Sequence, residues 1–552
     1  MGAYCEIDLN NKAPFVKFKT STGDNSVVEL AHNGNGFVSI DSNGKRLDNI
    51  VELYQVFEDN TSLRRPTGWQ EKGVKLLKES QQLENHLPCA FSISSFDLKT
   101  GEFYEFSSLY GSFNDVESFN AAAGQFSVSS SKEMIKETEE LVKSYLPKGL
   151  KTSNPLFDEY ISQSLLDNNL RGGFPIILDD KKEGQPYYIF SRKHGDMERD
   201  YNAFNIPSTY FSSGPGNFRD VNQNRRSDLY FINQIKDYNI KIFFSLIQMD
   251  GQNPLTVKPL VFKKNDNFDE SILNGLFVKD KVLDLVSKGS QPGDIYTLLK
   301  DNNVKNADDV FANILSNCHQ EISASFSEGY WIDHWTYNVD LLENYLSVYP
   351  DKMEELLFKN DYKYFHSLVY VNPRSEKYCY VAKDKIRQYG TIDLAALKAE
   401  NEKAGLKGTE TLWKKDQNGK EIQVSLASKI FNLILIKFST LDAHQMGIEM
   451  ECEKPGWNDA MNGLPGLFAS AMSETIELLR LVDFAIDNFK AYENRDVALM
   501  DEQYDLYTAV RDGVDELLNN KICLTTTRQS WVPVACCPAH ARPIPYYIIR
   551  RK

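Results

Sequence analysis

Three short stretches of the sequence carry side chains that could hold a sugar and donate a proton to it. In the first, Arg219, Asp220 and Gln223 follow the glycine-rich segment 213–217 at the start of a predicted helix. Residues three or four positions apart on a helix lie on neighbouring faces. A planar guanidinium, a carboxylate and an amide placed there can bind several hydroxyl groups at once. The alternative interpretation is an ordinary ion pair at the start of a helix.

The second stretch, SEGYWIDHW (327–335), combines aromatic and ionisable side chains in an expected loop before a helix. Trp331 could pack its ring against the apolar face of a pyranose, and Asp333 could accept hydrogen bonds from hydroxyl groups. His334 would lie beside them, although a single histidine is more often structural than a catalytic base. Glu328 adds a further carboxylate to the same segment.

The third stretch, EKPGWNDAMNGLPG (453–466), places Trp457, Asn458 and Asp459 on a loop rich in glycine and proline. An apolar wall formed by Trp457 would raise the pKa of the Asp459 carboxyl group, as a general acid requires. The alternative is a turn in which the Asn458 and Asp459 side chains only accept hydrogen bonds from the backbone.

A helix is predicted directly after this loop, in SETIELLRLVDFAIDNF (473–489). Ser473 is expected to cap it, because a serine hydroxyl can accept a hydrogen bond from a free backbone N–H group of the first turn. Glu474 and Glu477 suit the positive end of the helix dipole.

The elements that must position these stretches differ along the chain. Residues 1–130 contain short segments rich in β-branched and aromatic residues, separated by turn signals, and predict a β-sandwich domain. Apolar residues take helical spacing from there on, so 131–150 is predicted as a linker helix. Residues 151–530 alternate helical segments with loops, which indicates a helical barrel or a bundle of hairpins, and 531–552 is predicted as an irregular tail.

The fold class is therefore α+β, in separate domains. The predicted strands of the first domain are CEIDL, FVKFKT, SVVELA, GFVSID, VELYQVF and AFSISSFDL. The predicted helices of the second domain include LFDEYISQSLLDNNL, RSDLYFINQI, VDLLENYLSVY, DLAALKAENEKA and TIELLRLVDFAIDNF.

Composition restricts the partners and the compartment. The chain has 552 residues and a net charge of -15, which argues against nucleic acid or an anionic membrane surface as the main partner. Its eight cysteines form no CxxC pair, as expected for reduced thiols in a cytoplasmic protein without a zinc site. No signal-peptide pattern opens the chain, and no apolar run approaches the ~18 residues of a membrane span. We therefore expect a cytoplasmic protein that binds neither a metal nor a membrane.

In their order along the chain, the three stretches resemble the cellobiose-phosphorylase class of glycoside phosphorylases, within the six-hairpin glycosidase superfamily. The segment Phe218–Gln223 looks like the Phe-Arg-Asp-x-x-Gln signature of that class. Residues 331–334 occupy the place of its Ser-Asp-Asp-Leu segment, and Trp457-Asn458-Asp459 matches its Trp-Asn-Asp motif. The resemblance runs from about residue 150 to 490 and is strongest to the large relatives that act on β-linked oligoglucans.

The resemblance implies a β-sandwich, a linker helix and an (α/α)6 barrel with its site at one end. It also implies inverting cleavage of a β-linked gluco-oligosaccharide, in which a carboxylic acid protonates the leaving oxygen and inorganic phosphate attacks the anomeric carbon. Glucose 1-phosphate is then released without a metal or an organic cofactor. By position, Arg219, Asp220 and Asp333 would hold the reacting sugar, Trp457 would shape the cavity and Asp459 is the candidate acid. A homodimer is expected by analogy with the relatives only.

Two alternatives stay open. An inverting hydrolase on the same scaffold would need a carboxylate base about 6.5–9.5 Å from the acid, with room for a water molecule. Glu328, Asp333 and Glu451 are the candidate bases. A non-catalytic sugar-binding chain is the second alternative, because the phosphorylases usually have an aspartate where this chain has Gly456.

Overall fold

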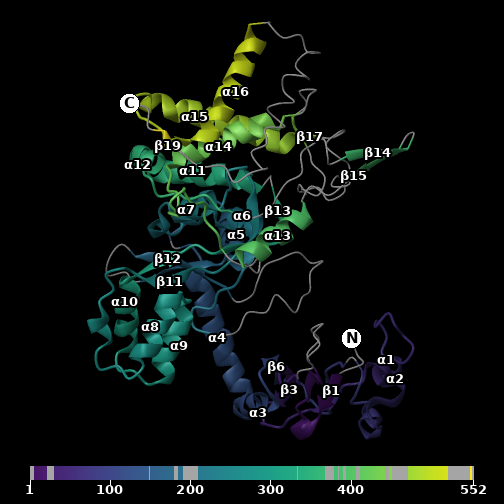
Figure 1. Cartoon of the computed structure of the whole chain (residues 1–552). Coiled ribbons are helices and arrows are strands. Elements are labelled where there is room, and N and C mark those ends of the chain that lie inside the picture. Colours follow the sequence, from purple (N-terminus) through teal and green to yellow (C-terminus); the bar gives the residue numbers. More distant parts are fainter. Residues whose placement is uncertain are drawn as a thin grey trace. The chain divides into compact units, whose positions relative to one another are not determined.

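Helices and small antiparallel sheets both contribute to the fold, which confirms the predicted mixture of the two (Figure 1). The chain divides into two compact units, Met1–Leu146 (unit 1) and Pro147–Lys552 (unit 2). The computed structural model describes residues 5–20, 30–86, 88–147, 149–178, 184–190, 209–331, 334–366, 378–382, 385–388, 393–405, 411–441, 447–449, 470–519 and 548–549.

Unit 1 is built mainly from strands, followed by helices at its C-terminal end. Its strands and helices are β1 (Cys5–Asp8), β2 (Phe15–Phe18), β3 (Gly34–Asp41), β4 (Asp48–Ile50), α1 (Leu53–Phe57), α2 (Thr67–Lys72), β5 (Phe91–Ile93), β6 (Phe106–Phe113), α3 (Val116–Gln125) and α4 (Val128–Tyr145), with 3₁₀ helices at Asn10–Lys12 and Gly73–Lys78.

The main core of unit 1 lies between a four-stranded antiparallel sheet, in the order β1-β2-β3-β6, and helix α3. Val38 and Ile40 of β3 pack in one cluster with Phe119 and Ala123 of α3. Helix α3 begins at this point because the Asp115 side chain accepts a 2.7 Å hydrogen bond from the backbone N–H of Ser118. The apolar face of the sheet is thus covered by a helix.

Two segments of unit 1 differ from the prediction. VELYQVF (51–57) was expected to be a strand, but Leu53–Phe57 forms α1. Residues 116–125 form α3 within a region predicted to be β structure. Short apolar segments fit a strand or a helix equally well, and packing decides between them. The described strands of unit 1 form the four-stranded sheet with a helix on it and a separate two-stranded sheet, β4-β5, so the sandwich of two packed sheets stays a prediction.

The contact between β3 and α3 depends on a glycine. Gly36 of β3 faces Gly111 of β6 across the ladder. A Cβ atom on Gly36 would lie 2.2 Å from the Phe119 ring, whereas one on Gly111 would lie 3.6 Å from the nearest atom, in Phe113. Because Phe119 is fully buried, its ring has little room to move away.

We expect Gly36→Ala to lower the free energy of unfolding of unit 1 by about 1–3 kcal/mol, as overpacking of a core usually does. Gly111→Ala is the matched control and should change it by about 0.5 kcal/mol or less. Calorimetry that follows the unfolding of unit 1 measures both values. Equal effects of the two substitutions would contradict the packing described here.

Unit 2 alternates helices with two- and three-stranded antiparallel sheets. Its first half contains α5 (Pro155–Gly172), β7 (Phe174–Leu178), β8 (Gln185–Ile189), β9 (Gly216–Asn217), α6 (Phe218–Arg225), α7 (Tyr238–Ser245), β10 (Asn253–Val257), β11 (Val261–Lys264), α8 (Lys279–Lys288), α9 (Pro292–Asp301), α10 (Ala307–Ser316), β12 (Cys318–Glu321) and β13 (Ala324–Trp331), with 3₁₀ helices at Asp228–Tyr230, Asn233–Ile235 and Glu270–Leu273.

The second half of unit 2 is mostly helical. It contains α11 (Tyr337–Val348), α12 (Met353–Phe358), β14 (Tyr378–Ala382), β15 (Lys385–Gln388), α13 (Leu394–Ala404), α14 (Leu426–Ser439), β16 (Ile448–Glu449), β17 (Ser470–Ala471), α15 (Met472–Phe489), β18 (Leu499–Met500), α16 (Asp501–Leu518) and β19 (Ile548–Ile549), with 3₁₀ helices at His334–Thr336, Pro350–Lys352 and Lys490–Tyr492.

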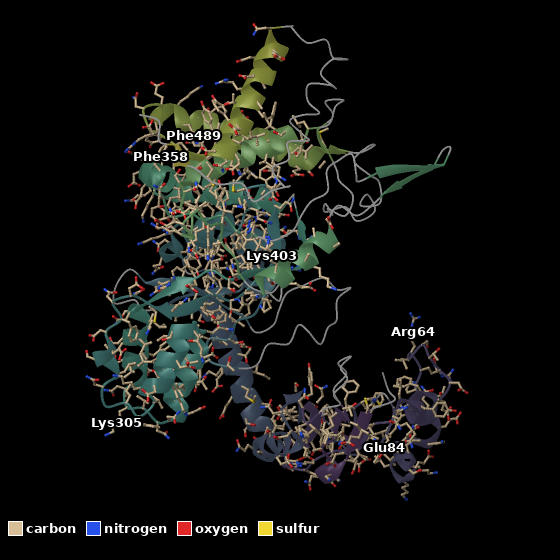
Figure 2. All side chains as sticks on the ribbon, viewed as in Figure 1. Arg64, Glu84, Lys305, Phe358, Lys403 and Phe489 are labelled. Atoms are coloured by element: carbon tan, nitrogen blue, oxygen red, sulfur yellow. The ribbon has the colours of Figure 1, made fainter. Side chains whose placement is uncertain are left out.

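One continuous apolar core runs through unit 2, and its side chains pack between the helices and the small sheets (Figure 2). Phe218 at the start of α6 meets Phe243 of α7 edge to face, with 5.2 Å between the ring centroids. Trp335, Leu342 and Leu481 belong to the same core and are fully buried. Helices α6, α7, α11 and α15 therefore share one interior.

Three expectations for unit 2 need correction or stay open. RSDLYFINQI (226–235) was predicted as a helix but forms two 3₁₀ helices, and its Tyr230 hydroxyl donates to Asn344 of α11. This contact between distant segments overrides the local helical pattern. SEGYW (327–331), predicted as loop, belongs to strand β13. The described helices of unit 2 do not by themselves form a closed barrel, so the (α/α)6 barrel is not confirmed and stays a prediction.

No helix in the described part of the chain has both the length and the apolar character that a bilayer crossing requires.

Candidate functional site

The first predicted stretch lies at the start of α6, which begins at Phe218 as expected. The Asn217 side chain caps this helix by accepting a 3.0 Å hydrogen bond from the backbone N–H of Arg219. Arg219 donates from Nε and Nη2 to one oxygen of Asp220, at 3.0 and 2.8 Å. The simple ion pair therefore exists. Both side chains also keep an exposed fraction, 21% for Arg219 and 11% for Asp220, so a sugar hydroxyl could share their hydrogen bonds.

Gln223 lies further along α6 and is half-buried. It follows Asp220 by three positions, so the two side chains lie on neighbouring faces of the helix, as predicted.

Most of the second stretch forms a strand rather than the predicted loop. Glu328 and Trp331 lie on β13, and His334 begins the 3₁₀ helix before α11. Strand β10 pairs with β13 on one side and β9 on the other, with Asn253 opposite Trp331 and Thr256 opposite Asn217. The segments that lead into α6 and α11 are thus two strands of one sheet. Asp333 lies outside the described residues.

The third stretch, 453–466, lies wholly outside the described residues. Trp457, Asn458, Asp459 and the candidate base Glu451 all lie outside the described residues. On either side of them, β16 pairs with β17 through Ile448 opposite Ala471 and Glu449 opposite Ser470. This short ladder closes the base of segment 450–469 directly before α15.

The predicted cap of α15 is wrong. Ala471 takes the N-cap position, and no side chain caps the helix there. Ser473 lies in the first turn instead, because α15 begins at Met472, directly after strand β17. The Thr475 hydroxyl holds the two chain ends together, since it accepts a 2.8 Å hydrogen bond from the Ile448 N–H and donates one of 2.7 Å to the Ala471 carbonyl.

Buried polar contacts join the middle of α6 to the start of α11, and the residue before α11 to the start of α15. Asn222 of α6 donates from Nδ2 to Oδ1 of Asn338, in the first turn of α11, at 2.6 Å. Trp335, directly before α11, donates from Nε1 to Oε1 of Glu474, in the first turn of α15, at 2.8 Å. Each of the three predicted stretches precedes or begins one of these helices. The structure therefore brings α6, the described part of the second stretch and the start of α15, which follows the third stretch, to one region of unit 2.

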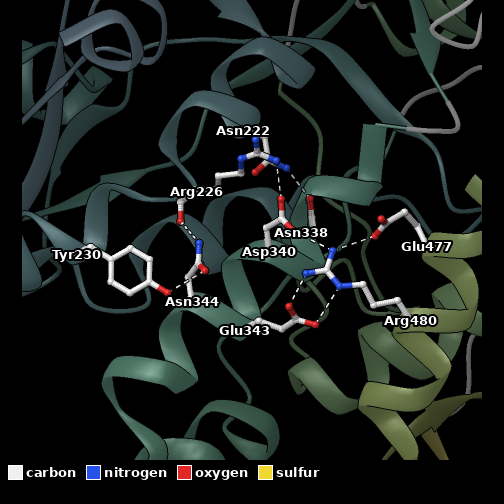
Figure 3. A network of polar contacts seen from close by, with 9 residues as sticks. All are labelled: Asn222, Arg226, Tyr230, Asn338, Asp340, Glu343, Asn344, Glu477 and Arg480. Atoms are coloured by element: carbon white, nitrogen blue, oxygen red, sulfur yellow. Dashed lines mark hydrogen bonds and ion pairs between the residues drawn. The ribbon is translucent and has the colours of Figure 1, made fainter. Parts of the chain in front are cut away.

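A partly exposed network of charges joins the same helices further along their length (Figure 3). Asp340 of α11 accepts from Arg226, at 2.6 Å, and from Arg480 of α15, at 2.8 Å. Arg480 also binds Glu343 through both carboxylate oxygens and donates to Glu477 at 3.1 Å. These acceptors, the Glu343 carboxylate first, raise the pKa of the Arg480 guanidinium, so it stays charged and fixes α15 against α11.

The cavity behind α6 is too small for a sugar. It has a volume of about 20 Å³ and is lined by residues of β8, β9, α6 and β10 together with Ser213 and Gly214. A single water molecule needs roughly 10–15 Å³ by this measure. A larger hollow of about 390 Å³ lies elsewhere on unit 2, along Glu343 of α11 and Arg480, Asp483 and Phe484 of α15.

Buried polar side chains surround this cavity. The Tyr188 hydroxyl donates to Asp228 at 2.9 Å and accepts from Asn239 at 2.8 Å. The Arg225 guanidinium stacks 3.5 Å from the centre of the Tyr188 ring and donates to the Gly172 carbonyl at 2.7 Å. Burial raises the pKa of Asp228 to about 7, and the Tyr188 hydrogen bond and Arg225 oppose this rise only in part.

The raised pKa of Asp228 predicts how the free energy of unfolding changes with pH. Between the usual aspartate value of about 3.9 and the folded-state pKa of about 7, the folded state holds the Asp228 proton more tightly than the unfolded state. Its contribution to the free energy of unfolding therefore falls as the pH rises through this window. Asp228→Asn keeps an oxygen that can accept from Tyr188 and cannot titrate, so this fall should be absent in the variant.

The measurement is the free energy of unfolding of unit 2 at several pH values from 4 to 8, for the wild type and Asp228→Asn. We expect the variant to gain stability relative to the wild type as the pH rises. The exposed Asp266→Asn, also in unit 2, is the matched control and should track the wild type. Parallel curves for Asp228→Asn and the wild type would show that Asp228 does not titrate in this range.

Within the described residues, no three His, Cys, Asp or Glu side chains gather closely enough to hold a metal ion. The expectation that the protein needs no metal stays a prediction.

Sequence reasoning missed one important feature, the burial of Glu474 against Trp335 and Lys437. Glu474 was expected only at the positive end of a helix. A signal was present in IFNLILIKF (430–438), where Lys437 is the single charged residue of an apolar run. A charge in such a run is either buried with a partner or at the edge of the core.

No protein-family model matches this chain, and no curated protein matches its sequence.

Proposed function

We propose that this protein is a carbohydrate-active enzyme that cleaves β-linked gluco-oligosaccharides with inversion, using inorganic phosphate as the nucleophile. One observation carries the proposal: the Asn222–Asn338 hydrogen bond joins α6 to the start of α11, and the Trp335–Glu474 hydrogen bond joins the residue before α11 to the start of α15. Three sequence motifs of the phosphorylase type begin or precede these helices. Such motifs form one site only if their helices start close together.

The chemistry assigns a role to each group. Arg219, Asp220 and Asp333 would hold the hydroxyl groups of the reacting glucosyl unit. Asp459 would give its proton to the leaving glycosidic oxygen as the bond from that oxygen to the anomeric carbon breaks. A phosphate oxygen would form the new bond to the anomeric carbon from the opposite face, so a β-linkage yields α-glucose 1-phosphate.

The assignment of a β-sandwich and an (α/α)6 barrel is part of this proposal. An enzyme of this class would carry its β-sandwich in unit 1 and its (α/α)6 barrel in unit 2, with α4 as the helix between them. The motif segments would then lie at one end of the barrel, where a saccharide can enter.

The experiment is incubation of the purified protein with β-1,2-, β-1,3- and β-1,4-linked gluco-oligosaccharides, each with and without phosphate. We expect α-glucose 1-phosphate, identified by NMR, to appear only when phosphate is present. Free glucose without phosphate would indicate the inverting hydrolase instead. Binding of an oligosaccharide without either product would indicate a non-catalytic sugar-binding protein, and both of these results would overturn the proposal.

A further inference from the structure

Helix α15 is apolar on two faces, and only one of them is buried. The buried face contributes Leu478, Leu481 and Phe484 to the core of unit 2. The other face leaves four large apolar side chains between 45% and 60% exposed, namely Met472, Ile476, Leu479 and Ile486. A contiguous exposed apolar surface of this kind is typical of a site where another molecule binds.

The exposed residues have the spacing of a coiled-coil seam. Positions 472, 476, 479, 483 and 486 follow one another at alternating steps of four and three residues. This is the repeat of about 3.5 residues with which one helix packs along another. The one polar member of this set, Asp483, is also exposed. We call these five residues the α15 seam. A single polar residue in such a seam lowers the stability of the contact but fixes the register of the partner helix.

The hollow of about 390 Å³ lies beside the centre of the α15 seam. Its lining includes Ile476, Leu479 and Asp483 of the seam, together with Glu343 of α11. Ligand sites typically have volumes of roughly 300–1,000 Å³. The hollow can therefore receive large side chains of a helix that lies along the seam.

The charges that line the hollow determine which helix fits. Three carboxylates, those of Glu343, Asp483 and Asp487, share the lining with one cation, Arg480. Arg480 is already bound to carboxylates of α11 and α15 (Figure 3). The lining therefore keeps a net negative charge, which attracts a basic helix and repels an acidic one. A second copy of this chain would bring the same carboxylates to the contact, and such like charges lower affinity.

We propose that the α15 seam is the docking site for a basic amphipathic helix of a partner protein. Apolar side chains at heptad spacing on the partner cover Ile476 and Leu479, and a Lys or Arg side chain beside them pairs with Asp483. Recognition of an amphipathic helix through such anchors is a common mode of peptide binding. This inference goes beyond the proposed function and does not depend on catalysis.

The test uses two synthetic peptides of about 21 residues, each with three heptads and Leu at positions a and d. The basic peptide has Lys at positions e and g and at the central a position, and the acidic peptide has Glu at the same places. Like charges at these positions keep each peptide from pairing with itself. Fluorescence anisotropy of the labelled peptides measures their binding to the full chain at low and at high salt.

Two variants of the α15 seam are each compared with a matched control. Leu479→Ser removes the centre of the seam, and Leu170→Ser is its control, because both leucines are 60% exposed and lie on helices of unit 2. Asp483→Asn removes one charge of the seam, and Asp266→Asn is its control. All four side chains are exposed, so each variant should keep a melting temperature close to that of the wild type.

We expect the wild type to bind the basic peptide and not the acidic one. Leu479→Ser should weaken this binding at least ~10-fold, because burial of one leucine side chain is worth more than a factor of ten in affinity. Asp483→Asn should weaken it about threefold at low salt and less at high salt, because salt screens exposed charges. Both controls should bind like the wild type.

Several results would overturn the inference. If the wild type does not bind the basic peptide, or binds both peptides equally, the α15 seam does not select a basic helix. Equal losses in Leu479→Ser and Leu170→Ser would show that binding is not confined to the seam. Self-association of the wild type in sedimentation, abolished by Leu479→Ser, would show that a second copy covers the seam instead. None of these results depends on phosphorolysis, so this inference and the proposed function can fail separately.

Discussion

Asp459→Asn is expected to lower the turnover of β-linked gluco-oligosaccharides by at least ~10²-fold, because general acid catalysis contributes about that much. An asparagine side chain has nearly the size of aspartate but has no acidic proton to give to the leaving oxygen. Binding of the oligosaccharide should stay within a few-fold of the wild type, because the hydroxyl-binding groups on the other segments are unchanged. Steady-state phosphorolysis and calorimetric binding measure the two effects.

Glu451→Gln is the informative companion to this variant. Phosphorolysis needs no carboxylate base, since phosphate itself attacks the anomeric carbon, so Glu451→Gln should leave the phosphate-dependent rate near that of the wild type. An inverting hydrolase needs such a base to activate water.

An unchanged turnover rate in Asp459→Asn would show that Asp459 is not the general acid, and another carboxylate would then have to supply the proton.

Lys437→Met is expected to have the largest effect on stability. It removes the ammonium group that lies 2.6 Å from Glu474 and leaves that carboxylate buried without an opposite charge. Removing one partner of a buried ion pair costs about 3–5 kcal/mol. Calorimetry or chemical denaturation of unit 2 gives this value directly.

Two further variants show whether the missing charge is the cause. Lys437→Met combined with Glu474→Met should recover much of the loss, because no buried charge then lacks a partner. Lys263→Met removes one member of an exposed pair with Glu321 and should cost about 1 kcal/mol or less. If the double variant is as unstable as Lys437→Met alone, lost packing rather than the unpaired charge is responsible.

Much of the local structure near the candidate site could be predicted from the sequence. Helix α6 starts at Phe218 as expected, because Asn217 supplies a capping oxygen directly before an apolar residue. Helix α15 occupies the predicted segment, because its apolar residues recur at helical spacing. The start of α15 was misplaced by two residues, since Ala471 joins a strand whose partner lies over twenty residues earlier.

The contacts between segments could not be predicted in this way. Asp340 and Arg480 are 140 positions apart, and Trp335 and Glu474 are 139 positions apart. A charged residue on the surface of a predicted helix does not indicate which distant residue it will bind. For the same reason, Glu474 was predicted only to lie at the positive end of a helix, and its burial against Trp335 and Lys437 was not foreseen. Long-range pairing is a property of the packed unit rather than of the local sequence.

The position of β10 has a consequence for the thermodynamics of ligand binding. This strand is hydrogen-bonded to β9 on one side and to β13 on the other. Strand β9 lies directly before α6 in the chain, and β13 lies shortly before α11. Strands β9 and β13 would therefore lose little conformational entropy if a ligand bound to both. Part of the ordering entropy has already been lost during folding, so more of the gross interaction energy remains as affinity.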